Sequence, residues 1–170
     1  RDYDKTESWI MRARNGEENL LWPGTIKWFA KSSGTSNSKS KFIPISDDSL
    51  NLCHYDGMQN MLSTYLDNYP DSRLLEGMAL TLGGSARIDE EGNGKTQYGD
   101  LSAILLKNSP VLAEFRRTPP AEIALISDFE KKVNEICKIS SKQNVTSFSG
   151  VPSWNLILLN AILDFSGKRD

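Results

Sequence analysis

The apolar positions of the chain form short extended runs as well as longer helical segments. Residues 26–30 (IKWFA) and 41–45 (KFIPI) are rich in apolar and aromatic side chains, which predicts two strands. Because proline has no N–H for a sheet ladder, Pro44 excludes the second strand from a central position in a sheet. Residues 73–85 (RLLEGMALTLGGS) predict one or two buried strands, and residues 145–150 (VTSFSG) predict another short strand.

Other segments have the composition or the periodicity of helices. Ser46 can cap one of these helices and Pro70 closes it, while Gly167 ends the last one. The best amphipathic pattern has apolar residues at Ile123, Ile126, Phe129, Val133, Ile136 and Cys137. The predicted helices span residues 4–18, 46–70, 121–144 and 151–167.

Two segments between these elements are harder to assign. Residues 87–100 (RIDEEGNGKTQYGD) are charged and glycine-rich, which predicts a surface hairpin. Residues 100–110 (DLSAILLKNSP) fit either a short helix or a buried strand. The order helix, strand, helix over residues 121–167 favours an α/β fold.

Composition indicates a soluble globular protein. The 170 residues amount to about one domain, with 38% hydrophobic and 25% charged residues. The net charge of -2 provides no field that would recruit nucleic acid or an anionic membrane. The longest apolar run, residues 156–159, is far too short for a membrane span, and no signal peptide opens the chain. The two cysteines, Cys53 and Cys137, are far apart in sequence and have no close set of Cys or His partners at metal-ligand spacing. We therefore expect reduced thiols and a cytoplasmic setting.

A loop rich in serine separates the first two predicted strands. Residues 31–44 (KSSGTSNSKSKFIP) combine Ser, Thr and Gly with three lysines, including Lys39 and Lys41. Backbone N–H groups, hydroxyls and nearby cations are the groups that hold phosphate oxygens. A flexible hairpin loop with solvating lysines is the alternative reading of the same residues.

Several other motifs are weaker candidates for a site. Residues 92–96 (GNGKT) end like a Walker loop, but Asp89 stands where that motif requires glycine, so a turn is predicted. His54, the single histidine, fits a structural or surface position, and no nucleophile elbow is present. Arg116 and Arg117, before two prolines, are either surface arginines at a helix start or a clamp for a carboxylate.

Four stretches of the chain together resemble a known enzyme family. They are WPGTIKWFAKSSGTSNSKSKFIPIS (residues 22–46), LTLGGS (80–85), YGDLSAILLKN (98–108) and NVTSFSGVPSWNLILL (144–159). The chain resembles the auxin-responsive-promoter family of acyl-acid amido synthetases, in particular its bacterial members, within the superfamily of adenylate-forming enzymes. The resemblance extends over nearly the whole chain.

The resemblance implies a ligase that uses ATP and Mg²⁺. Family members convert a carboxylic acid to an acyl-adenylate, and an amine or amino acid then displaces AMP to form an amide. The first nucleotide motif of the family maps onto Ser32, Ser33, Gly34, Thr35 and Ser36, with Lys41 as its downstream lysine. We expect the acyl pocket to be bordered by Gly150, Val151, Pro152, Trp154 and Arg117.

The chain also departs from the family pattern, because two further nucleotide motifs and the C-terminal lid domain do not occur in it. We therefore expect residues 1–170 to be part of the large N-terminal adenylation domain of the luciferase-like, adenylate-forming fold. Its partners would be ATP, a small carboxylic acid, an amine or amino acid and the remainder of its own polypeptide, with no nucleic acid or membrane. On its own this fragment should be inactive. The alternative is a non-catalytic module that binds a nucleotide or anion, or an interaction domain.

Overall fold

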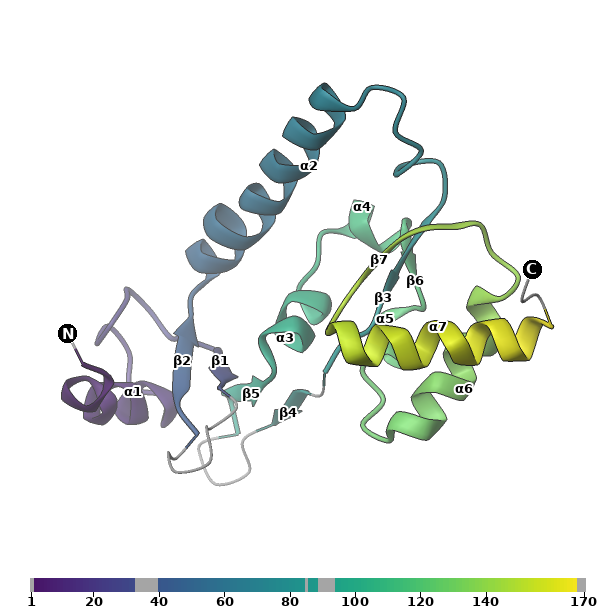
Figure 1. Ribbon diagram of the computed structural model, residues 1–170. Coiled ribbons are helices and arrows are strands. Elements are labelled where there is room, and N and C mark those ends of the chain that lie inside the picture. Colours follow the sequence, from purple (N-terminus) through teal and green to yellow (C-terminus); the bar gives the residue numbers. More distant parts are fainter. Residues whose placement is uncertain (1, 33–39, 85, 89–93, 168–170) are drawn as a thin grey trace. The chain divides into compact units, whose positions relative to one another are not determined.

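The computed structural model describes residues 2–32, 40–84, 86–88 and 94–167 and has mixed α/β structure, as predicted (Figure 1). It divides into two compact units that interleave along the sequence. Unit 1 comprises Arg1–Gln59 and Ala86–Asn108, and unit 2 comprises Asn60–Ser85 and Ser109–Asp170. Each unit has its own sheet, and each is described by itself below.

Unit 1 contains a four-stranded sheet in the order β2-β1-β5-β4. β1 (Trp28–Lys31) pairs antiparallel with β2 (Phe42–Ile45) and parallel with β5 (Gln97–Gly99). β4 (Ala86–Ile88) pairs antiparallel with β5, which confirms the predicted hairpin. β2 occupies an edge of the sheet, as the proline within it requires.

Both faces of β1 are covered by apolar side chains. Successive side chains of a strand point to opposite sides of the sheet, so neighbouring residues of β1 enter different clusters. Trp28 and Ala30 pack into one apolar cluster with Ile104. Phe29, which is fully buried, packs into a second cluster with Ile10. The sheet of unit 1 therefore has an apolar layer on each side of its central strand.

Unit 1 also contains helices, two of which contact strands of this sheet. The predicted helix over residues 46–70 is confirmed, and the Ser46 hydroxyl accepts a hydrogen bond from the N–H of Ser49 at 3.1 Å. A π-helical stretch within this helix was not predicted. The segment 100–110, left open by the sequence, forms a helix. The elements are η1 (Tyr3–Lys5), α1 (Glu7–Arg14), the π-helical η2 (Ser49–Tyr55), α2 (Asp56–Asn68), which continues into unit 2, and α3 (Leu101–Lys107).

Unit 2 contains a three-stranded parallel sheet in the order β6-β3-β7. The central strand β3 (Met78–Thr81) lies between β6 (Arg117–Thr118) and β7 (Val145–Ser149). Both predicted strand regions, residues 73–85 and 145–150, are confirmed. Because the strands are parallel, their carboxyl ends meet at one edge of the sheet, which is where ligands bind in open α/β sheets.

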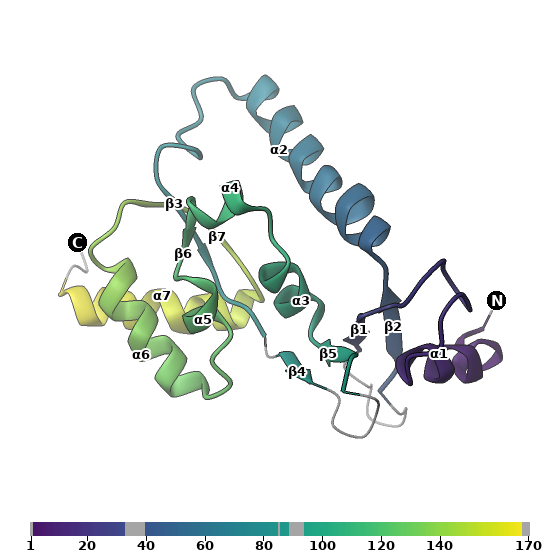
Figure 2. The same cartoon turned by 180° about the vertical axis from the view of Figure 1, so that it is seen from behind.

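Two helices, α6 (Phe129–Ser140) and α7 (Pro152–Ser166), pack against each other in unit 2 (Figure 2). Their apolar faces join β3 in one core, centred on the buried side chains of Leu80, Ile136 and Leu158. Shorter helices, α4 (Val111–Glu114) and α5 (Ala121–Ala124), lie in the connections around β6. No helix among the described residues is long and apolar enough to cross a bilayer.

One predicted helix is interrupted in the structure. The segment 121–144 forms α5 and α6 as separate helices, because Asp128 caps the second one. Its carboxylate accepts a hydrogen bond from the N–H of Lys131 at 2.9 Å. The backbone of Asp128 is extended, as is usual for the residue that caps the start of a helix, so a helix cannot continue through it. The last predicted helix is confirmed, and it ends at Gly167 with a left-handed backbone (φ 68°).

Candidate functional site

The serine-rich loop connects two neighbouring antiparallel strands, β1 and β2, as predicted. Ser33, Gly34, Thr35 and Ser36 lie outside the described residues. The two ends of the loop are joined by hydrogen bonds: the N–H of Ser32 donates to the Lys41 carbonyl at 2.9 Å, and the N–H of Lys41 donates to the Ser32 hydroxyl at 3.1 Å. The loop is thus closed at its base as a hairpin, with Lys41 exposed.

Cations and aromatic rings surround the base of this hairpin. Phe42 and Tyr98 meet edge to face with ring centroids 5.6 Å apart. The Arg14 guanidinium lies 4.0 Å from the Phe42 centroid and 5.1 Å from that of Tyr98, and Lys31 lies 5.9 Å from the Tyr98 centroid. The rings contact the charged groups of these side chains, so positive charge is concentrated near the base of the hairpin.

Lys41 has its own aromatic partner. Its ammonium lies 5.1 Å from the centroid of Tyr3, whose hydroxyl accepts a hydrogen bond from the N–H of Phe42 at 3.0 Å. The sequence analysis missed Tyr3 because nothing local connects it to β2, 39 residues away. Tyr98 could have been found, since it opens one of the stretches that carry the family resemblance.

The Walker-like segment is a structural turn in its described part. Thr96 is fully buried, and its hydroxyl donates to the carbonyl of Arg14 at 2.9 Å. Gly94 has a positive φ of 69°, which suits a turn. The hydroxyl that would contact a metal ion in a Walker loop is therefore occupied by the protein backbone.

The second predicted region, the turn between β7 and α7, lies at the carboxyl edge of the unit 2 sheet. Gly150 and Val151 follow the last residue of β7, and Pro152 is the first residue of α7. The ring of Trp154 lies 5.9 Å from that of Phe129 on α6 and remains 41% exposed. The turn therefore presents apolar surface next to backbone groups, as a pocket for an organic acid requires.

Glycine is required at position 150 by a close approach. Gly150 has φ 153°, and a Cβ there would lie 2.8 Å from the Asn155 side-chain oxygen. Asn155 is only 7% exposed, although it belongs to the first turns of a strongly apolar helix. The sequence analysis missed Asn155, but a single amide in the run PSWNLILL is a usable signal.

Lys132 is a second buried polar residue at this edge. It is 5% exposed, and its ammonium donates to the carbonyl of Gly83 at 2.7 Å, which ties α6 to the loop after β3. The N–H of Leu82 in turn donates to the carbonyl of Ser149 at 3.3 Å. The ends of β3 and β7 are therefore held together immediately before the turn at Gly150.

Arg117 belongs to a different part of unit 2. It lies on β6 opposite Ala79, whereas Ser149 on β7 lies opposite Thr81, on the other side of β3. Its guanidinium donates to the Ser109 hydroxyl at 3.1 Å and forms an ion pair with Glu114. The structure thus joins Arg117 to the segment around α4, and it does not bring Arg117 together with Gly150 and its neighbours.

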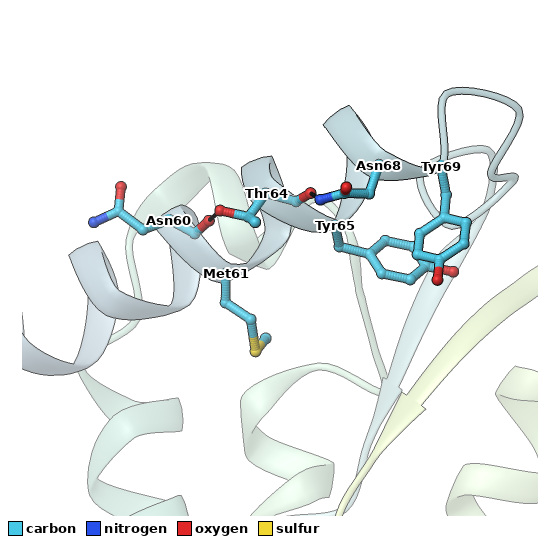
Figure 3. A pocket seen from close by; sticks show the side chains of 6 residues that line it. All are labelled: Asn60, Met61, Thr64, Tyr65, Asn68 and Tyr69. Atoms are coloured by element: carbon cyan, nitrogen blue, oxygen red, sulfur yellow. Dashed lines mark hydrogen bonds between the residues drawn. The ribbon is translucent and has the colours of Figure 1, made fainter.

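A hollow of about 550 Å³ lies along α2 (Figure 3). The rings of its aromatic residues Tyr65 and Tyr69 are tilted by 35° to each other, with centroids 4.9 Å apart. Two of its polar side chains bond to the backbone of their own helix, since Thr64 donates to the Asn60 carbonyl and Asn68 to the Thr64 carbonyl. These groups are used internally, so the hollow offers no better site than the two predicted regions.

Comparisons with known proteins bear on the family and the fold of the chain. A family model described as "GH3 family N-terminal domain" matches residues 1–165. No curated protein sequence matches the chain. Two solved structures with TM-scores of 0.65 are similar in fold: "GH3.15 acyl acid amido synthetase" at 20% identity and "AtGH3.15 acyl acid amido synthetase in complex with 2,4-DB" at 21% identity.

The matched region is a small part of those synthetases. The alignments cover 95% and 96% of this chain but 28% and 29% of the matched chains. At this level of identity the structural matches show a shared fold. They extend over both units of the chain.

Proposed function

Because the chain belongs to the GH3 family, through its match to the family's N-terminal domain, we propose that it is part of an ATP-dependent acyl acid amido synthetase. In the first step, a carboxylate oxygen of the acid attacks the α-phosphorus of ATP and pyrophosphate leaves. In the second step, the nitrogen of an amine or amino acid attacks the acyl carbon, AMP leaves and the nitrogen loses a proton. An amide results.

The hairpin between β1 and β2 would hold the phosphates. The observation that carries this proposal is its closed base, where Ser32 and Lys41 are bonded to each other at 2.9 and 3.1 Å, with one cation at the end of β1 (Lys31) and another just before β2 (Lys41). The bonded base holds together the two ends of the segment that carries Ser32, Ser33, Gly34, Thr35 and Ser36. Donors held in place stabilise the charge that develops on departing pyrophosphate more than mobile ones do.

Within this proposal the β7–α7 turn, residues 150–154, borders the acid. Its position at the carboxyl edge of a parallel sheet and the exposed ring of Trp154 support this role. Arg117, which we also proposed for the acid pocket, would act there only if it exchanged its bonds to Ser109 and Glu114 for the substrate.

Magnesium ions belong to this type of chemistry, but the described part of the hairpin does not fit one. Its described side chains include the Ser32 hydroxyl and the Lys31 and Lys41 ammonium groups, which suit phosphate oxygens, whereas the N–H groups of Ser32 and Lys41 are already bonded across its base. Among the described residues there is no group of three or more His, Cys, Asp or Glu side chains that could hold a metal ion. None of the roles proposed above depends on a Mg²⁺ ion carried by ATP.

We further propose that residues 1–170 supply only part of the adenylation domain. The coverage of 28–29% of the matched synthetases supports this view. The remainder of the polypeptide would bring the groups that bind adenine and ribose, together with a lid domain. The setting that fits ATP and reduced cysteines is the cytoplasm.

A lysine-reactive ATP derivative tests the phosphate site. An acyl-phosphate form of ATP, added to a complete synthetase that contains this chain, should transfer its acyl group to Lys41, and excess ATP should block the transfer. Lys107 is the matched control, because it also lies over an aromatic ring, that of Trp28 at 5.2 Å, but outside the hairpin. Labelling of both lysines to the same extent, or labelling that ATP does not reduce, would contradict the proposal.

A further inference from the structure

Three strongly exposed apolar side chains lie together at α4 in unit 2. Val111, Leu112 and Phe115 are 71%, 80% and 73% exposed, and we refer to them as the α4 patch. Val111 and Phe115 are four residues apart, so their side chains lie on the same side of the helical turn. Large apolar side chains that gather at one place on a surface are typical of a site of contact with another polypeptide segment.

A buried arginine holds α4 in place. Arg117 on β6 is buried, and its guanidinium donates to the Ser109 hydroxyl at 3.1 Å and forms an ion pair with the Glu114 carboxylate. The Ser109 hydroxyl also donates to Glu114. Ser109 lies just before α4 and Glu114 is its last residue, so this network ties both ends of the helical turn to the sheet. The α4 patch cannot turn into the core of unit 2 without breaking these bonds, and it is therefore held ready for a partner.

Arg116 adds an exposed positive charge beside the α4 patch. Its guanidinium donates to the carbonyl of Leu75, a neutral acceptor, and it forms no ion pair with any of the described residues. Leu75 is itself half exposed, so it extends the apolar surface on the other side of the guanidinium. A partner that complements this surface needs an apolar groove with a carboxylate at its edge.

We propose that the α4 patch and Arg116 form the surface on which the rest of the synthetase polypeptide docks. The docking segment presents an apolar groove to the patch and an acidic side chain to Arg116. Arg117 positions α4 for this contact and does not itself touch the partner. The inference rests on the proposal that residues 1–170 are part of a longer synthetase, and it adds where and by what chemistry the other part binds.

A segment of the same polypeptide fits this surface better than a second copy of the chain. The alignments cover 28% and 29% of the matched synthetases, so more than two thirds of each lies outside the matched part. A tethered segment reaches the α4 patch at a far higher effective concentration than a separate molecule does. A symmetric dimer through the same patch would also bring two Arg116 guanidinium groups into one interface, where like charges repel.

Photo-crosslinking in a complete synthetase that contains this chain tests the docking surface. Phe115→p-benzoylphenylalanine places a light-activated ring in the α4 patch. Lys142→p-benzoylphenylalanine is the control, because Lys142 is an exposed residue of unit 2 outside the patch. Illumination should join position 115, and not position 142, to a peptide outside residues 1–170 at the mass of a single polypeptide. A crosslink at the mass of a dimer, a crosslink within residues 1–170, or no crosslink from position 115 would overturn the proposal.

Thermal melting of the same variant in two contexts measures what the contact contributes. Phe115→Ser should lower the Tm of the complete synthetase by roughly 2–4 °C and should change that of the 170-residue chain by less than about 1 °C, because the exposed ring contributes little there. Arg116→Glu should lower the Tm of the complete synthetase more than Lys142→Glu does. Equal shifts of the complete synthetase and the 170-residue chain with Phe115→Ser, or equal effects of the two charge reversals, would contradict the proposal. Neither experiment uses ATP, so a failure here is distinct from a failure of Lys41 labelling, which reports on the phosphate site.

Discussion

Replacing Lys41 with alanine should reduce the use of ATP far more than it reduces folding stability. Lys41 is exposed, and its described contact through the ammonium is with the ring of Tyr3 at 5.1 Å. An exposed cation–π contact contributes about 0.5–1 kcal/mol, so the free energy of unfolding should fall by no more than about 1 kcal/mol. A hydrogen bond from the ammonium to a phosphate contributes about 1.5–3 kcal/mol. Its loss should lower kcat/KM for ATP about tenfold to a hundredfold.

The assay measures adenylation by a complete synthetase of this family that contains the chain, at several ATP concentrations, together with urea unfolding of the same variant. Lys107→Ala is the control, because Lys107 contacts the Trp28 ring at 5.2 Å and bonds to Gln97 but lies outside the hairpin. It should lose a similar small amount of stability and keep its kcat/KM. Equal losses of kcat/KM in the two variants, or a change below about twofold in Lys41→Ala, would refute the assignment of Lys41 to the phosphates.

Two further predictions concern stability and thiol chemistry. Gly77→Ala should lower the free energy of unfolding by about 2–3 kcal/mol in a urea titration, because the new Cβ would lie 2.2 Å from the Asn144 carbonyl oxygen. Gly57→Ala on α2, where nothing lies within 4 Å, should raise it by about 0.5–1 kcal/mol, and equal effects would argue against the close approach. Burial raises the pKa of the Cys137 thiol, so its reactive thiolate forms only at higher pH than usual. Iodoacetamide at pH 8 should therefore alkylate the exposed Cys53 first, as mass spectrometry would show, whereas equal native rates would contradict this.

The local patterns of the sequence predicted most of the elements. Pro44 indicated an edge strand, and β2 is at an edge because the proline cannot donate within a ladder. Gly167 indicated the end of α7, where it adopts a left-handed backbone. The break between α5 and α6 was missed, although Asp128 followed by an apolar repeat was a usable capping signal.

Pairing over long distances could not be predicted from such patterns. β1 pairs in parallel with β5, some 70 residues later, and β3 pairs with both β6 and β7. These registers depend on which apolar faces meet in the folded chain, and a single strand's composition does not specify its neighbour. The division into two interleaved units follows from the same long-range pairings. The length of 170 residues, which suggested one domain, does not indicate these pairings.

The sequence indicated where the candidate site lies, but not the residues from distant segments that support it. The composition of residues 31–44 and the family resemblance together indicated the hairpin. Its aromatic supports, Tyr3 and Tyr98, come from distant segments and required the structure. Asn155 was overlooked because the apolar run around it predicted only a core helix, whereas its burial and its close approach to Gly150 are visible only in three dimensions.

The central claim is that this chain provides the phosphate-binding part of an acid-activating synthetase and needs further residues for catalysis. Exchange of labelled pyrophosphate into ATP, dependent on an added carboxylic acid, measures the first step directly. A complete synthetase containing these residues should catalyse the exchange with at least one acid of a panel, and Lys41→Ala should impair it. The 170-residue chain alone should show none, because without the adenine- and ribose-binding groups it would bind ATP weakly. Robust exchange by the chain alone, or full exchange by Lys41→Ala in the complete enzyme, would contradict the account.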